Sequence, residues 1–353
     1  MLKTLTMRLA ALLVLSSLVL SACSSLGGPT PTEVEIVFDP AQIQTQEAAT
    51  PQPTPTLRPT STPTPEPAIP PTPTNTLDPY HTLIFEGVQL REQEKFEESL
   101  AKLNEAIQMD PANPKGYIER GITYVAMQRL DEAITEFNFA LNYDPNSAEA
   151  YNARGNAWVQ KNQYNQAIKD FSKAIELQPD FAKAYTNRAI TYMLQGNVEE
   201  SLKDFTKVVE LRPDDPEAYF NRGQAYINAA NKFEDALYVE LCIADFTQAI
   251  AIYPDNADSY FNRGLCNSIK GNIVRSMEDY NKAISLDANQ AKYYLYRALL
   301  YPDLGTLEQA MSDAQKVIEL AQDDDLRQVA EQMLTAIPKT PTPTAGPTPT
   351  PLD

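Results

Sequence analysis

Small and large apolar positions recur along the chain with a spacing of 34 residues. Counting from Tyr80, seven successive units cover residues 80–113, 114–147, 148–181, 182–215, 216–256, 257–290 and 291–324. Position 8 of each unit is small: Gly87, Gly121, Gly155, Ala189, Gly223, Gly264 and Ala298. Position 24 is large in the first six units: Leu103, Phe137, Phe171, Phe205, Phe246 and Tyr280. Because small residues allow two helices to approach and large ones fill the space between them, each unit is predicted to be a packed helical pair.

Further positions strengthen this pattern. Position 4 is tyrosine in six units, position 27 is alanine or valine, and a proline closes five units. Together these residues resemble the tetratricopeptide repeat (TPR) family, and the match covers about seventy per cent of the chain. The resemblance implies an all-α fold, a right-handed superhelical solenoid of seven helix-turn-helix repeats whose first helices line a concave groove.

Two units depart from the regular pattern. The fifth has seven extra residues between Ala229 and Leu241, and we expect them to lengthen its second helix, beginning near Asn231, by about two turns. The apolar run that follows is either a packing surface or an accessory contact site. In the seventh unit Pro302 should end the first helix early, and residues 325–337 should form a capping helix.

Position 7 is arginine in six units, and position 23 is acidic in the same six. A row of arginines alone would suggest anion binding. In the first unit, however, the two positions are Glu86 and Lys102, so both charges have exchanged together. This exchange predicts an ion pair within each repeat.

The TPR resemblance also implies which side chains face the groove. The candidate partner-binding residues are Asn152, Asn156, Asn187, Asn221, Asn228, Asn262, Phe220, Phe261 and Tyr296. An asparagine side chain carries a donor and an acceptor, so a row of them can hydrogen-bond the main chain of an extended peptide. The alternative is that asparagine is an ordinary polar residue here. Only fragments of the family's carboxylate-binding lysine and asparagine set are present.

The N-terminus has the pattern of an export signal. Lys3 and Arg8 precede an apolar stretch over residues 9–20, which is short for a membrane span. Residues 20–23, Leu-Ser-Ala-Cys, resemble the lipobox of bacterial lipoproteins. We therefore expect a signal peptide over residues 1–22, lipidation of Cys23 and an extracytoplasmic location on a bacterial cell membrane; an ordinary secretory signal is the alternative.

Once Cys23 is assigned to lipid, two cysteines remain. Cys242 and Cys266 occupy repeat positions that favour small apolar side chains, so we expect buried free thiols rather than a disulfide.

Proline-rich sequence flanks the repeats. Fourteen of the 28 prolines lie within residues 29–79 and six from Pro338 onward. Such sequence cannot bury a core and favours extended polyproline II. A disordered linker over residues 23–79, a repeat domain over residues 80–337 and a disordered tail over residues 338–353 are predicted.

Charge and composition narrow the function. With 29 basic against 47 acidic residues the formal net charge is -18, which disfavours nucleic acid binding. One histidine, and the lack of phosphate-loop, zinc-type or nucleophile motifs, give no basis for a metal, a cofactor or catalysis. The sequence predicts a membrane-anchored adaptor that binds proteins or peptides in its groove, or alternatively a cell-envelope accessory protein that binds glycan or another non-protein ligand.

Overall fold

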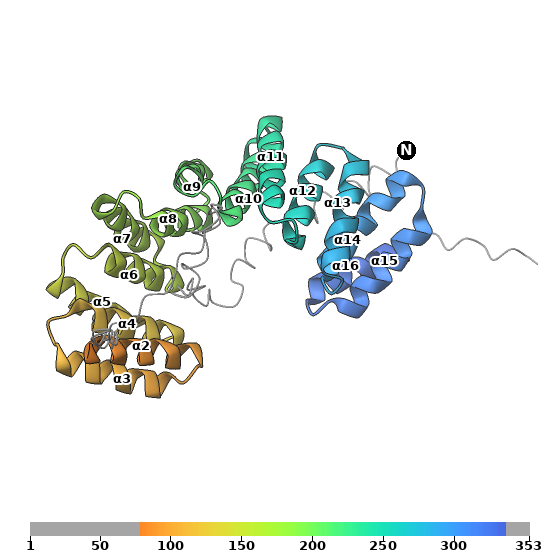
Figure 1. The fold of residues 1–353 in the computed structure, drawn as a ribbon. Coiled ribbons are helices and arrows are strands. Elements are labelled where there is room, and N and C mark those ends of the chain that lie inside the picture. Colours follow the sequence, from red (N-terminus) through yellow and green to blue (C-terminus); the bar gives the residue numbers. More distant parts are fainter. Residues whose placement is uncertain (1–77, 337–353) are drawn as a thin grey trace, which may run out of the picture. The chain divides into compact units, whose positions relative to one another are not determined.

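The computed structural model describes residues 78–336, and all regular structure in that range is helical (Figure 1). The helices form consecutive hairpins, one for each predicted repeat. The hairpins are α2 (Pro79–Glu92) with α3 (Phe96–Met109), α4 (Pro114–Ala126) with α5 (Leu130–Tyr143), α6 (Ala148–Gln160) with α7 (Tyr164–Leu177), α8 (Ala182–Leu194) with α9 (Val198–Leu211), α10 (Pro216–Phe233) with α11 (Ala236–Ile252), α12 (Ala257–Ile269) with α13 (Ile273–Leu286), and α14 (Ala291–Leu300) with α15 (Leu307–Leu320). A final helix, α16 (Asp324–Ala336), follows them. The predicted all-α fold is confirmed.

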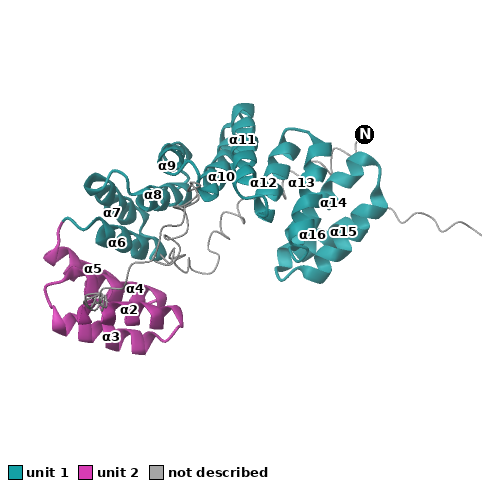
Figure 2. Cartoon of the chain, viewed as in Figure 1, with its two compact units in different colours: residues 1–17, 146–353 teal, residues 18–145 magenta. Residues whose placement is uncertain are grey.

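The described residues divide into two compact units (Figure 2). The unit that comes first along the chain, residues 78–145, is magenta in Figure 2 and contains the first two hairpins; we call it the first unit. The second unit, residues 146–336, is teal and contains the other five hairpins and α16. In each unit the closest packing joins the two helices of one hairpin.

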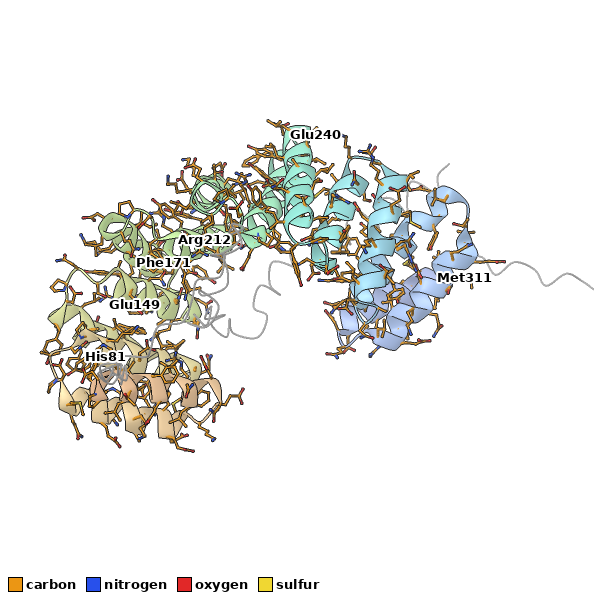
Figure 3. The ribbon with its side chains drawn as sticks, viewed as in Figure 1. His81, Glu149, Phe171, Arg212, Glu240 and Met311 are labelled. Atoms are coloured by element: carbon orange, nitrogen blue, oxygen red, sulfur yellow. A yellow bond between two sulfur atoms is a disulfide. The ribbon has the colours of Figure 1, made fainter. Side chains whose placement is uncertain are left out.

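The predicted contact between positions 8 and 24 is present in both units. A Cβ atom placed on Gly121 would lie 2.6 Å from Cε1 of Phe137, and one on Gly155 would lie 2.5 Å from Cε1 of Phe171. Both phenylalanines are fully buried, and Figure 3 labels Phe171. Because real Cβ atoms do not approach so closely, each glycine lets the ring lie directly against the helix backbone.

A tight turn joins the two helices of each repeat, and we call it the intra-repeat turn. Each of the seven turns contains one residue with a left-handed backbone: Glu94, Gln128, Asn162, Gly196, Glu234, Gly271 and Gly305 have φ between 55° and 84°. Prolines and side-chain caps start several of the helices that follow an inter-repeat loop. Asn113, for example, accepts a hydrogen bond from the main-chain N–H of Lys115, with Pro114 at the first helical position.

The fifth repeat distributes its insertion differently from the expectation. Its first helix, α10, has 18 residues against 13 in α8, and its second, α11, has 17 against 14 in α9. The expectation that the second helix alone is lengthened is therefore wrong. The chain stays helical through Phe233, turns at Glu234, and restarts where the Asp235 side chain caps α11.

The apolar run of α11 packs against its own repeat. Val239 is buried, and the ring of Tyr238 stacks on that of Tyr226 with centroids 6.2 Å apart. This supports the packing interpretation for this run.

The last repeat follows its sequence. The first helix, α14, has ten residues, and Pro302 lies in a 3₁₀ turn (Tyr301–Leu304) that comes directly after it. The capping helix α16 buries Ala330, with Leu326 and Val329 half-buried beside it. The predicted early helix end and cap are confirmed.

The expectation of free thiols is wrong. Cys242 in α11 and Cys266 in α12 form a disulfide, with their Cα atoms 6.3 Å apart and both side chains buried. The bond joins neighbouring repeats, because α11 packs on α12 and brings together cysteines that are 24 residues apart. Repeat spacing alone does not reveal such a contact.

Other predictions lie outside the described residues. These are the signal peptide, Cys23, the linker before Asp78, the last residue of the predicted capping helix, and the tail over residues 338–353. Within residues 78–336, none of the helices combines the length and apolar character needed to cross a membrane.

Candidate functional site

Positions 7 and 23 form an ion pair inside every repeat, as predicted. The pairs are Glu86–Lys102, Arg120–Glu136, Arg154–Asp170, Arg188–Asp204, Arg222–Asp245, Arg263–Asp279 and Arg297–Asp313, with N to O distances between 2.6 and 2.8 Å. We call the six arginines at position 7 and their carboxylate partners the ladder. Because each ladder arginine already has a carboxylate partner, the repeat structure explains the row of arginines.

The arginine pairs are largely buried. The Arg188 side chain is 18% exposed and that of Asp204 is 7% exposed. Both oxygens of Asp204 accept from the guanidinium, and Arg188 Cζ lies 5.7 Å from the centre of the Tyr185 ring. Burial raises the pKa of Asp245, although its hydrogen bonds from Arg222 oppose that shift. These groups hold the two helices of a repeat together.

The predicted groove asparagines all lie in the second unit, and two of them are joined. Asn187 in α8 donates from Nδ2 to Oδ1 of Asn152 in α6, at 2.9 Å. Asn187, Asn221 and Asn262 occupy the same position in α8, α10 and α12, which are the first helices of three successive repeats. These three side chains make up what we call the amide row.

The asparagines differ in how far their amides are occupied. Asn228 and Asn262 each donate to a main-chain carbonyl four residues earlier, at 3.0 and 2.8 Å. The side chains of Asn156 and Asn221 are half-buried, and their amide groups have no hydrogen-bond partner among residues 78–336. Unused donors and acceptors on a half-buried amide suit hydrogen bonding to a peptide main chain.

The predicted aromatic residues are packed inside the second unit. Phe261 and Tyr296 are only 7% and 9% exposed, and their ring centroids lie 5.1 Å apart. Phe261 also contacts Tyr280 and Tyr293, and burial raises the pKa of Tyr296 to about 12. Phe220 is half-buried and meets Phe246 edge to face. Phe261 and Tyr296 thus contribute to packing between two repeats, and Phe220 to packing within its own repeat.

The first unit has a polar contact that sequence reasoning missed. Glu119 is 4% exposed and pairs with Arg91 at 2.9 Å and with Lys115 at 2.8 Å. Burial favours a higher pKa for Glu119, but the two cations outweigh it and the pKa is lowered. The sequence signal that could have predicted this contact is the pair of opposite charges at position 12 of one repeat, Arg91, and position 6 of the next, Glu119.

Two shallow concavities, of about 310 and 230 Å³, lie beside intra-repeat turns and contain none of the nine predicted residues. Among residues 78–336, no group of three or more His, Cys, Asp and Glu side chains is placed to hold a metal ion.

The geometry defines an all-helical repeat protein whose hairpins share one internal packing scheme. Family models identify the repeat. A TPR repeat model matches residues 87–128, 121–161, 155–196 and 191–228, and a tetratricopeptide repeat model matches residues 246–278. Tetratricopeptide repeats are therefore detected over residues 87–228 and 246–278. No curated protein matches it.

Solved structures share the fold at low identity. A chain of the APC/C hetero-tetramer Cut9–Hcn1 is 16% identical with a TM-score of 0.55, over 74% of this chain and 50% of that one. This chain thus spans about half the length of that relative. A tetratricopeptide repeat protein from Parabacteroides merdae is 19% identical with a TM-score of 0.51, over 73% and 98% of the two chains. The C-terminal part of a TPR protein from Cytophaga hutchinsonii is 16% identical with a TM-score of 0.54, over 70% and 98%. These likenesses show the TPR solenoid fold.

Proposed function

We propose that this protein is a membrane-anchored, extracytoplasmic adaptor that binds a peptide segment of a partner protein along its amide row. TPR repeats generally bind protein or peptide partners, and proteins built from them are typically non-enzymatic scaffolds. The observation that carries the proposal is the recurrence of asparagine at one position of α8, α10 and α12, with the Asn221 amide left without a partner in the described residues.

The chemistry of the amide row favours main-chain recognition. A side-chain amide can donate to a peptide carbonyl and accept from a peptide N–H, whatever the peptide side chains are. The row is uncharged, so it selects for extended backbone rather than for a charged group. Glycan binding is not proposed, because Phe261 and Tyr296, the rings expected to stack on sugars, are buried.

The binding test compares two double variants of the tagged, full-length protein. We expect Asn187→Ala/Asn221→Ala to reduce recovery of crosslinked partners by about tenfold, which corresponds to the loss of two hydrogen bonds. Asn231→Ala/Asn289→Ala removes two exposed asparagines outside the row and is the matched control. Equal recovery from wild type and both variants would contradict groove binding.

Membrane anchoring rests on the N-terminal sequence. The positive residues, the apolar stretch and the lipobox-like residues 20–23 coincide, and a cysteine thiol is the group that accepts the lipid. Metabolic labelling with an alkyne fatty acid should mark the wild-type protein but not Cys23→Ser, and only the wild type should sediment with membranes. Labelling of the Cys23→Ser protein, or its firm retention in membranes, would contradict the anchor.

A further inference from the structure

The second unit exposes large apolar side chains at an unusual place. Seven of its eight exposed large apolar residues lie at helix ends beside the intra-repeat turns of repeats 4 to 7: Leu194, Phe233, Leu237, Ile269, Val274, Leu304 and Leu307. Leu237 is 58% exposed and Val274 is 67% exposed. The eighth, Tyr253, ends α11 at the opposite side of its hairpin and is 50% exposed.

Hydrogen bonds and ion pairs show that neighbouring turns lie side by side. Lys232, near the end of α10, donates to the carbonyl of Gly196 in the preceding repeat's turn at 3.0 Å. Lys270, after α12, pairs with Glu240 near the start of α11, and Figure 3 labels Glu240 there. These contacts place the turns of repeats 4, 5 and 6 along one border. We call this border, together with the turn of repeat 7 that follows in the series, the turn edge.

Folding of the repeat does not require apolar turns. The turns of repeats 1 and 2, at residues 93–95 and 127–129, have no exposed large apolar side chain beside them. The turn of repeat 3 is followed by Tyr164 and is otherwise polar, with Lys161, Asn162 and Gln163. Since polar turns suffice in these three repeats, the apolar turns of repeats 4 to 7 indicate a contact surface.

The charges around the turn edge restrict what it contacts. Within six residues of its four turns there are eight exposed acids: Glu199, Glu200, Glu234, Asp235, Glu240, Glu278, Asp303 and Glu308. Four exposed bases share this border: Lys203, Lys232, Lys270 and Arg275. Three of these bases already pair with acids of the same border. The edge is therefore apolar with an acidic surround.

The interval between successive apolar turns suits a bound partner that is helical. Neighbouring helices pack about 8–10 Å apart, so the edge presents a new apolar group at roughly that interval. One heptad of an α-helix rises about 10.5 Å and presents one apolar pair. An extended strand presents same-face side chains about every 6.7 Å, which fits the interval less well.

We propose that the turn edge of repeats 4 to 7 docks a basic amphipathic helix of a partner protein. Apolar residues of that helix cover Phe233, Leu237, Ile269 and Val274, and its lysines or arginines meet the acidic surround. The same charges oppose other occupants. The chain's own apolar segment at residues 34–38 is flanked by Glu33 and Asp39, a second copy brings the same acids, and an anionic bilayer repels them.

Fluorescence anisotropy with the full-length protein tests this directly. The probe is a labelled Leu/Lys helix of roughly three heptads, beside a Leu/Glu version and a Leu/Lys peptide of scrambled periodicity. The Leu/Lys helix should bind at least about tenfold more tightly than either control. Leu237→Ser/Val274→Ser should weaken it by about tenfold or more, the loss expected from uncovering two apolar side chains. Tyr253→Ser, a matched loss of an exposed apolar residue off the edge, should leave binding unchanged.

Several results would overturn the proposal. Equal binding of the scrambled peptide, or binding unaffected by Leu237→Ser/Val274→Ser, would remove the turn edge as the site. If Leu237→Ser/Val274→Ser instead lowers binding to phosphatidylglycerol vesicles, the occupant is a membrane. If it lowers binding to a peptide of residues 30–44, the occupant is the linker, and if it lowers self-association measured by sedimentation, the occupant is a second copy. Asn187→Ala/Asn221→Ala should not change Leu/Lys binding, so this test and that of the amide row fail independently.

Discussion

The two units share the packing inside each hairpin and differ in the contacts made outside it. In both, a small residue at position 8 meets a large one at position 24, and an ion pair joins positions 7 and 23. The first unit has the buried Arg91–Glu119 pair between its repeats, whereas the second has the amide row, the disulfide and the apolar turn edge. The repeat-defining residues are thus those that pack the two helices of a hairpin together, and the features that distinguish the units lie at other positions, between repeats or on the surface.

The largest expected effect tests the shared interior. Phe137→Ala in the first unit and Phe171→Ala in the second should each cost about 3–5 kcal/mol, because both rings are fully buried and their loss leaves a cavity. Denaturant unfolding measures the total loss of unfolding free energy, and hydrogen exchange assigns that loss to one of the two units. A cost below about 1 kcal/mol in either unit would show that the interiors are not equivalent.

The disulfide should stabilise only the second unit. Reduction removes a crosslink across 24 residues and should cost about 2–4 kcal/mol. Thermal unfolding with and without reductant measures the cost, and hydrogen exchange in the first unit should not change. Cys242→Ala/Cys266→Ala is the control, since reductant should not affect it. Alkylation of both thiols in the native, unreduced protein would contradict the bond.

The next prediction separates ladder pairs from ordinary surface pairs. Arg188→Ala leaves the buried Asp204 carboxylate without its two hydrogen bonds and should cost about 2 kcal/mol. Lys203→Ala breaks the exposed pair with Glu200 and should cost less than about 0.5 kcal/mol. Equal costs in unfolding experiments would contradict a special role for the ladder.

Acid should weaken the first unit through Glu119. Its folded pKa lies below the usual 4.5, so its contribution is complete above that value and is lost as pH falls through the folded pKa. Asp245 in the second unit has a raised folded pKa, so its pH dependence is the reverse of that of Glu119. The stability that Asp245 contributes is present at low pH and is lost as pH rises through its folded pKa. Unfolding free energies of wild type and Glu119→Gln, measured from pH 6 down to roughly pH 3, should converge as pH falls. Parallel curves would contradict the assignment.

The smallest expected effect concerns the turn edge. Leu237→Ser and Val274→Ser should each change the free energy of unfolding by less than about 0.5 kcal/mol, because both side chains are already exposed. A cost above about 2 kcal/mol would mean that these residues support the fold instead of forming a contact surface.

Repeat register predicted what is local to one hairpin. The joint exchange of Glu86 and Lys102 was enough to predict pairing within repeats, and the glycine and aromatic positions predicted the helical packing. Register did not predict how deeply a side chain is buried or which side chains of a neighbouring repeat it contacts. It gives the direction in which Phe261 and Tyr296 leave their helices, but not that four aromatic rings meet there and become buried. The disulfide and the Arg91–Glu119 pair also depend on contacts between repeats.

The most direct test of the adaptor function is site-specific photocrosslinking in living cells. A benzophenone amino acid at Asn221 reports on the amide row, and one at Glu210, an exposed position on the second helix of its repeat and away from the turn edge, is the control. Binding along the amide row predicts a defined crosslinked partner from position 221 that Asn187→Ala diminishes, with none from position 210. Crosslinks from position 210 alone, or crosslinks at 221 that Asn187→Ala leaves unchanged, would contradict partner binding in the groove.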